Sequence, residues 1–66
     1  MRFGTRVIFE RGGGDNHREV VGVVVGARGH EVYIRLENDD PGDRSGWNKA
    51  GQIGHWSRGA IVRVLP

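Results

Sequence analysis

Residues 20–37 read VVGVVVGARGHEVYIRLE, and this stretch decides the fold. Its first half is rich in valine, whose β-branched side chain favours an extended strand over a helix. We expect a tight turn between Gly26 and Gly29, because glycine accepts a positive φ without a steric penalty. Residues 32–37 then alternate apolar and polar side chains, the pattern of a strand with one buried face. The stretch therefore predicts a β-hairpin.

The first strand of this hairpin is apolar on both faces, which is typical of a strand in the middle of a strongly bent sheet. Its valines are Val21, Val23 and Val25 on one face and Val20 and Val24 on the other. Gly22 lies between them, and a glycine inside a strand marks a bend, a bulge or a close approach of another backbone. Small barrels need such bends in order to close.

Shorter strand signals flank the hairpin. In residues 3–10 the alternation directs four side chains to one face: Phe3, Thr5, Val7 and Phe9. Residues 52–57 and 60–65 form two more strand candidates, with Trp56 turned inward in the first. The chain is thus predicted to be all-β, a single domain built as a small five-stranded antiparallel barrel. It has room for at most one short helical turn, near residues 58–61.

Composition narrows the class of protein. The chain has no cysteine, which excludes disulfides and thiolate metal sites and is compatible with a reducing cytoplasm. No apolar run reaches the roughly 20 residues of a membrane-spanning helix, and the N-terminal strand lacks the apolar core of a signal peptide. We therefore expect a soluble cytoplasmic protein that does not associate with a membrane.

No arrangement of residues typical of an enzyme occurs. The segment RGGGDN at residues 11–16 lacks the Gly-Lys-Ser/Thr ending of a phosphate-binding loop. The acids of residues 37–43 lack the spacing of an EF-hand calcium loop, which favours a solvated loop. His17, His30 and His55 are far apart in the sequence. We expect no enzyme activity, no cofactor and no metal site.

Charge is distributed unevenly along the chain. Ten Lys and Arg residues against eight Asp and Glu residues give a net charge of +2, but residues 37–43 contain four acids and no base. The remainder has ten bases against four acids, a balance of +6. Nine of the ten bases are arginine, whose planar fork suits phosphate or carboxylate. A GC-rich genome is an equally good explanation of the arginine bias.

The order of these features resembles the SH3-like barrels of the Tudor and KOW type. Those domains often open with a GDRV strand, here GTRV at residues 4–7. They continue with a G-x-V strand, here GVVV at residues 22–25, and a V-x-V-x-x strand, here VYIRL at residues 32–36. The resemblance implies binding, to nucleic acid or protein in KOW domains and to methylated side chains in Tudor domains. The four-aromatic cage of a Tudor domain has no clear counterpart in this sequence.

Two further resemblances concern parts of the chain. Residues 46–65 look like the closing portion of small uncharacterised bacteriophage-type proteins with a late tryptophan. Residues 4–7 and 51–53 resemble segments of the plasmid-borne type II dihydrofolate reductases, which are tetramers of such barrels. The active-site VQIY strand of those enzymes has no counterpart in the final strand, AIVRVL at residues 60–65.

Two surfaces remain free to bind a partner. The first, called the basic surface, combines the outer side of the second hairpin strand with the neighbouring turn and the first and last strands: Arg6, Arg28, His30, Tyr33, Arg35 and Arg63. Arginine donors beside an aromatic ring are typical of phosphate contacts combined with base stacking. This surface predicts a KOW-like nucleic-acid-binding module, and an ordinary solvated sheet face is the alternative.

The second surface, called the acidic loop, lies between the hairpin and the closing strands: Glu37, Asp39, Asp40, Asp43, Arg44 and Trp47. Trp47 either folds back to cap the barrel or is displayed for a ligand. This loop predicts a protein-interaction module, such as a phage or mobile-element factor that binds a host protein. That is the leading hypothesis, with nucleic acid binding as its alternative. Pairing of edge strands allows a homo-oligomer in either case.

Overall fold

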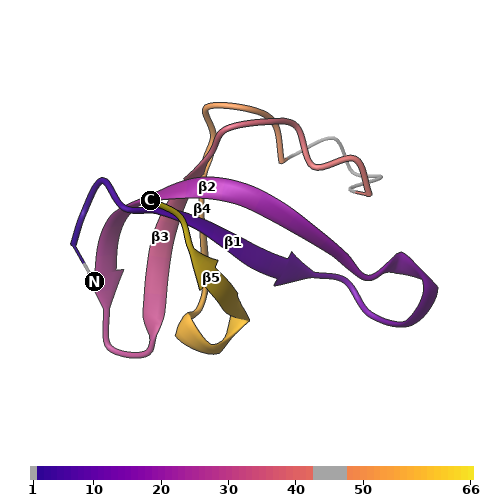
Figure 1. Ribbon diagram of the computed structural model, residues 1–66, viewed down its shortest axis with the longest axis horizontal. Coiled ribbons are helices and arrows are strands. Elements are labelled where there is room, and N and C mark those ends of the chain that lie inside the picture. The colour runs from indigo at the N-terminus through magenta and orange to yellow at the C-terminus, as the bar shows by residue number, and fades with distance from the viewer. Residues whose placement is uncertain (1, 43–47) are drawn as a thin grey trace.

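The structure is a computed structural model that describes residues 2–42 and 48–66. These residues form one sheet of five antiparallel strands, which confirms the predicted all-β class (Figure 1). The strands are β1 (Arg6–Arg11), β2 (Arg18–Arg28), β3 (Glu31–Leu36), β4 (Ile53–Ser57) and β5 (Ile61–Val64). Two 3-10 turns complete the described secondary structure, η1 (Gly14–Asn16) and η2 (Arg58–Ala60). The expectation of at most one helical turn is therefore wrong, because the amides of Asn16 and His17 donate to the carbonyl oxygens of Gly13 and Gly14 and close a second turn.

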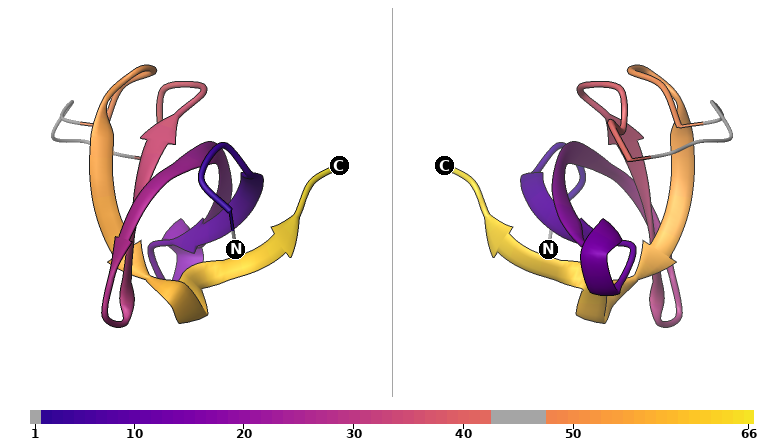
Figure 2. Two further views of the ribbon diagram at one scale, coloured as in Figure 1. Left: turned by 90° about the vertical axis from the view of Figure 1, so that its left-hand side faces the viewer. Right: turned by 90° about the vertical axis from the view of Figure 1, so that its right-hand side faces the viewer.

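The sheet curls around its core without closing. The order of the strands is β4-β3-β2-β1-β5, so β4 and β5 form its two edges. The two edge strands are joined through η2 and diverge from it (Figure 2). They do not pair with each other in the described part of the chain. The closed barrel expected from the sequence is therefore not confirmed.

The predicted hairpin is present, but its turn lies later than expected. β2 continues to Arg28, which pairs with Glu31, so the turn consists of Gly29 and His30. Gly29 has a φ of 59°, and no described residue other than glycine has a positive φ. A positive φ at the first turn position alone is the pattern of a type II′ turn, whose twist suits a hairpin. The turn predicted at residues 26–29 is thus wrong.

Gly26 belongs instead to a β-bulge within β2. Val24 pairs with Ile34 and Gly26 pairs with Tyr33, which leaves Val25 without a partner on β3. A bulge bends its strand and increases the local twist of the sheet. The second glycine of the valine stretch therefore contributes to the curl rather than to the turn.

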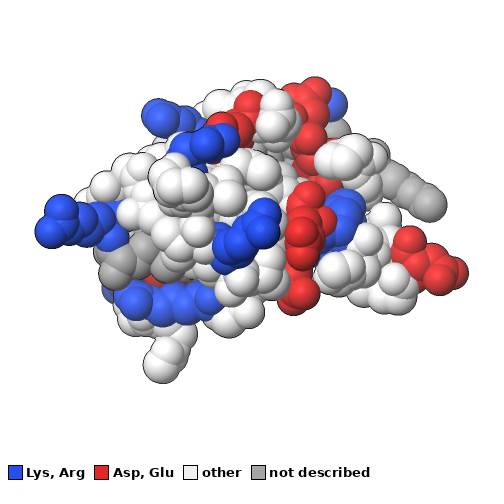
Figure 3. All heavy atoms as spheres, in the orientation of Figure 1, with Lys and Arg blue, Asp and Glu red and all other residues white. Residues whose placement is uncertain are grey.

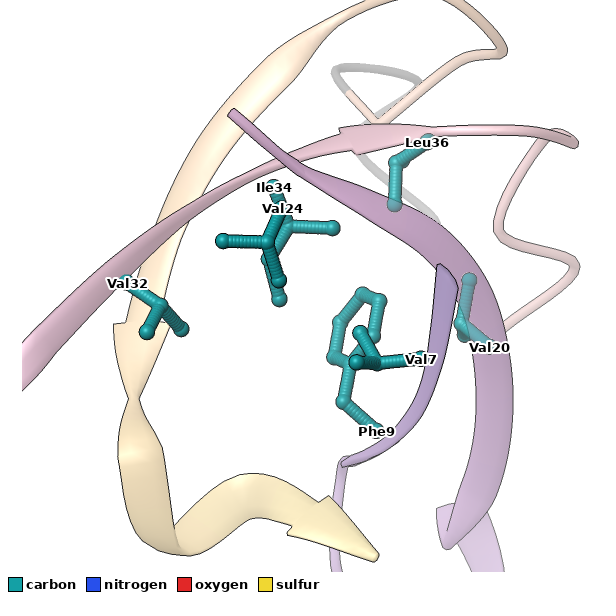
Figure 4. Close-up of a cluster of buried hydrophobic side chains, with 7 residues drawn as sticks. All are labelled: Val7, Phe9, Val20, Val24, Val32, Ile34 and Leu36. Atoms are coloured by element: carbon teal, nitrogen blue, oxygen red, sulfur yellow. The ribbon is translucent and has the colours of Figure 1, made fainter. Parts of the chain in front are cut away.

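The core lies inside the curl and consists of seven buried side chains (Figure 4): Val7, Phe9, Val20, Val24, Val32, Ile34 and Leu36. Trp56 and Ile61 pack against this cluster, which confirms the inward position expected for Trp56. Gly22 also faces it. A Cβ at Gly22 would overlap Cγ2 of Ile34 and lie 2.9 Å from the carbonyl oxygen of Arg35. The close approach of β2 and β3 therefore requires glycine at this position.

The N-terminal segment departs from its predicted structure. β1 begins at Arg6, and Phe3 is 67% exposed, so the expected position of Phe3 on the core face is wrong. Gly4 has a φ of 88°, and the amide of Thr5 donates to the carbonyl oxygen of Arg2 at 3.2 Å. The chain therefore turns ahead of β1 instead of extending it.

Candidate functional site

The outer side of the sheet, opposite the core, carries four residues of the basic surface. Alternate residues of β3 are buried, so Tyr33 and Arg35 lie on the outer side. Arg6 of β1 pairs with Val23 of β2, which pairs with Arg35, so both arginines lie in one row across three strands. Neighbouring strands are about 4.8 Å apart, which separates the two backbones by about 10 Å. Arg63 of β5 lies in the adjacent row.

The other residues of the basic surface lie at the end of the hairpin. Arg28 ends β2, His30 is the second turn residue, and both are exposed. The amide of Arg58 donates to the carbonyl oxygen of His30 at 2.9 Å, so η2 adds another arginine at this end. The sequence-based surface omits Arg58, because only the pairing of β4 with β3 brings it to the hairpin.

Tyr33 lies on the outer side of β3, which is flanked by β2 and β4. It pairs with Gly26 of β2 and with His55 of β4. The rings of Tyr33 and His55 meet edge to face, with centroids 6.3 Å apart. Nδ1 of His55 lies 2.8 Å from Oε2 of Glu31, so this carboxylate is engaged beside the tyrosine.

Arg6 is the one member of the basic surface with a carboxylate partner among the described residues. Its Nε and Nη2 donate to the two carboxylate oxygens of Glu37 at 2.7 and 3.0 Å. These hydrogen bonds lower the pKa of Glu37 and raise the pKa of Arg6. The pair therefore joins the basic surface to the first residue of the acidic loop.

Asp40 is buried and contacts two arginines, so the expectation of a solvated loop is wrong at this residue, whereas Asn38, Asp39 and Pro41 are exposed. Arg18 donates through Nε to Oδ1 at 2.5 Å and through Nη2 to Oδ2 at 2.8 Å. Nε of Arg11 lies 3.3 Å from Oδ2, and the amide of Gly42 donates to Oδ1 at 3.1 Å. Hydrogen bonding from Arg18 outweighs burial and holds the pKa of Asp40 below its usual value. Arg11, Arg18 and Asp40 form what we call the Asp40 cluster.

The Asp40 cluster reaches the core through Trp56. The guanidinium carbon of Arg11 lies 5.3 Å from the centre of the Trp56 ring, within the range of a cation–π contact. Trp56 in turn contacts Phe9, with ring centroids 4.6 Å apart. The cluster therefore fastens the segment after β3 to the adjoining ends of β1 and β2.

The remaining described acid of the acidic loop is also engaged. Oδ1 of Asp39 accepts a hydrogen bond from the amide of Ala50 at 2.9 Å, and Oδ2 lies 3.8 Å from Nζ of Lys49. The carboxylates of Glu37, Asp39 and Asp40 are therefore all bound by groups of the same chain. The other members of this surface lie outside the described residues: Asp43, Arg44 and Trp47.

In contrast to the acids of the acidic loop, most of the described arginines have no partner of opposite charge. Within residues 2–42 and 48–66, five arginines have no carboxylate within 4.0 Å: Arg2, Arg28, Arg35, Arg58 and Arg63. In the same residues, Asp15 and Glu19 have no basic group at that distance, and the basic partners of Glu10 and Glu31 are histidines, which carry a charge only when protonated. Figure 3 shows Lys and Arg prevailing on the left of one face, with Asp and Glu towards the right. Five described arginines and four described acids thus lack a permanently charged partner, so the excess of unmatched charge is basic and small.

Few other features of the described residues suggest a site. An open depression of about 230 Å³ is lined by Ile8, Glu19, Val62 and Arg63. No group of three metal-ligating side chains occurs in the described part of the chain. None of the described helices has the length and apolar character needed to cross a membrane. Comparisons of the chain with protein-family models, with curated proteins and with solved structures found no match.

Proposed function

We propose that the chain is a non-enzymatic nucleic-acid-binding module that contacts phosphates through its unpaired arginines. The observation that carries this proposal is the asymmetry of charge pairing. The described acids of the acidic loop are bound within the chain, whereas Arg28, Arg35, Arg58 and Arg63 have no carboxylate within 4.0 Å. A guanidinium without such a partner offers its planar fork to phosphate oxygens. Phosphate contacts carry no direct sequence information, so we expect binding that tolerates different sequences.

The internal ion pairs also reduce the repulsion between the acidic loop and a phosphate backbone. Glu37 is matched by Arg6, and Asp40 is matched by both Arg11 and Arg18. The potential around a surface depends on the sum of its charges, so paired carboxylates repel an approaching anion less than free ones. This change in balance favours nucleic acid over the protein partner that the sequence placed first.

A protein-interaction module is the second candidate, and the edge strands support it. Val62 and Val64 on β5 are 44% and 53% exposed, and Ile53 on β4 is 61% exposed. The free backbone groups of an edge strand can pair with another chain. In this form the chain is a host-directed phage or mobile-element factor, or a homo-oligomer joined through its edges. A sedimentation coefficient that equals the monomer value at every concentration in both wild type and Val62→Lys counts against self-pairing.

The fold assignment belongs to the same proposal. The curled sheet is an SH3-like barrel of the Tudor and KOW type that is left open between β4 and β5, and the module acts in the cytoplasm. Five antiparallel strands, the bulge in β2 and the η2 turn ahead of β5 support this assignment. The lack of cysteine is compatible with that compartment.

Fluorescence anisotropy with labelled oligonucleotides tests the proposed function. In about 50 mM salt, where phosphate contacts are strong, the wild-type protein should bind nucleic acid. Combining Arg28→Gln with Arg35→Gln should weaken binding by about tenfold or more, because hydrogen bonds to charged groups contribute about 1.5–3 kcal/mol each. Lys49→Gln is the matched control, since it removes a positive charge that already faces Asp39. Absence of binding to single-stranded and duplex probes alike, or an equal loss in the control, contradicts the proposal.

A further inference from the structure

We propose that the nucleic acid is bound as an unpaired strand, with one base stacked on the ring of Tyr33. This inference rests on the proposed function and names its ligand class, single-stranded DNA or RNA rather than a duplex. It rests on how Tyr33, Gly26 and two arginines are arranged on the outer side of the sheet. The ring of Tyr33 lies against the bare backbone of Gly26, with an unpaired arginine towards each end.

The position of the ring is set by the glycine opposite it. A Cβ built on Gly26 would lie 3.3 Å from Cδ2 of Tyr33 and 3.7 Å from its Cβ, so the ring occupies the space that a side chain would take. On the other side, His55 meets the ring edge to face and is itself held by Glu31. A tyrosine fixed in this way has little conformational freedom left to lose when a base covers it.

The flanking charges suit a strand that crosses the ring. Arg35 lies two residues from Tyr33 on the same side of β3, which places their backbones about 7 Å apart. Arg28 lies two residues beyond Gly26 on β2. Its backbone is opposite Glu31 in the strand register, so Arg28 and Arg35 lie on opposite sides of Tyr33 along the strands. Neither arginine has a carboxylate within 4.0 Å in the described chain. The register therefore places an arginine on either side of Tyr33, where the phosphates before and after a stacked base would run. Glu31, which lies opposite Arg28, is held by His55.

A duplex cannot use this arrangement. Its bases are stacked on one another, so their faces are covered, whereas an unpaired base can be turned out and laid on an aromatic ring. Every base has a π face, so this contact does not select one base over another. The contribution of Tyr33 should depend on the presence of a base and not on its identity.

The test uses four labelled probes in anisotropy titrations. They are oligothymidine of about 12 nucleotides, a length within the site size of single-stranded binders, oligouridine of that length, a duplex, and an abasic strand with the same phosphates. Tyr33→Leu keeps apolar cover over Gly26 but removes the ring, and Tyr33→Phe keeps the ring. Phe3→Leu is the matched control, because Phe3 is an exposed aromatic residue outside the basic surface. Circular dichroism of each variant separates lost stacking from lost folding.

We expect the wild-type protein to bind oligothymidine about 5- to 150-fold more tightly than the abasic strand, the range of base–aromatic stacking. Tyr33→Leu should lose that factor for oligothymidine and leave the abasic affinity unchanged, whereas Tyr33→Phe and Phe3→Leu should behave as wild type. The ratio of oligouridine to oligothymidine affinity assigns the strand to RNA or DNA.

Other outcomes separate the two proposals. Equal affinity for abasic and base-bearing strands, or an unaltered Tyr33→Leu, overturns base stacking while phosphate binding by the arginines stands. Duplex binding as tight as single-strand binding overturns the ligand class. Absence of binding to every probe contradicts the proposed function itself.

Discussion

Replacing Asp40 by asparagine removes one negative charge from the interior and leaves two arginines facing it. The Asp40 carboxylate is fully buried, while the side chains of Arg11 and Arg18 are 23% and 15% exposed. Removing one partner of a buried ion pair costs about 3–5 kcal/mol, because the other charge is left uncompensated. Water can reach both arginines in part, so we expect a loss at the lower end, about 3 kcal/mol. For a small domain that corresponds to a fall in Tm of about 12–24 °C.

Thermal and urea denaturation followed by circular dichroism measure this loss. Asp39→Asn is the matched control, because it makes the same chemical change in the neighbouring residue. The pair of Asp39 with Lys49 is exposed, and such pairs contribute at most about 1 kcal/mol. Equal losses in Asp39→Asn and Asp40→Asn would refute the inference that the Asp40 cluster fastens this segment to the core.

Acid titration of stability gives a second readout of the same substitution. Because the pKa of Asp40 is lower in the folded chain than in the unfolded chain, the unfolded chain binds more protons and stability rises with pH between the two values. The contribution is complete above the unfolded pKa of about 3.9 and is lost as the pH falls through the folded pKa. Asp40→Asn should therefore lose less stability than wild type on acidification below about pH 4.

Two further substitutions test the sheet. Gly22→Ala should destabilise the fold by about 1–3 kcal/mol, because its Cβ overlaps Ile34. Thermal denaturation compares it with Gly13→Ala, where a Cβ meets nothing within 4 Å, and similar losses would speak against the close approach of β2 and β3. Glu19→Gln should stabilise the fold by about 0.2–1 kcal/mol, because Glu10 and Glu19 pair across β1 and β2 and repel each other. A urea midpoint that does not rise would argue against this repulsion.

The hairpin could be predicted from sequence because its signals are local. The valine run and the alternation after it depend only on neighbouring residues, and they give the two central strands and the outward positions of Tyr33 and Arg35. The sequence alone does not locate the turn, because Gly26 and Gly29 are both compatible with a tight reversal. Pairing with β3 decides between them, since it leaves Val25 in a bulge and takes β2 on to Arg28.

The charge pairing could not be predicted in this way. Asp40 precedes Pro41 and Gly42, and that local pattern favours a solvated turn, whereas its partner Arg18 is 22 residues away. Arg58 reaches the hairpin end only through the pairing of β4 with β3. Both contacts depend on how distant strands align. The sequence alone therefore does not show that the acids of the acidic loop are bound within the chain, or that Arg58 adds charge to the hairpin end.

The salt dependence of binding tests the central claim most directly. Binding to phosphates releases counterions, so log K falls with log salt by about 0.7–0.9 for each phosphate contact. Removing Arg28 and Arg35 together should make this slope shallower by about 0.7–0.9 per arginine, while Lys49→Gln should leave it unchanged. A wild-type slope near zero, or a slope that Lys49→Gln reduces as much as the loss of both arginines does, would contradict phosphate binding through the unpaired arginines.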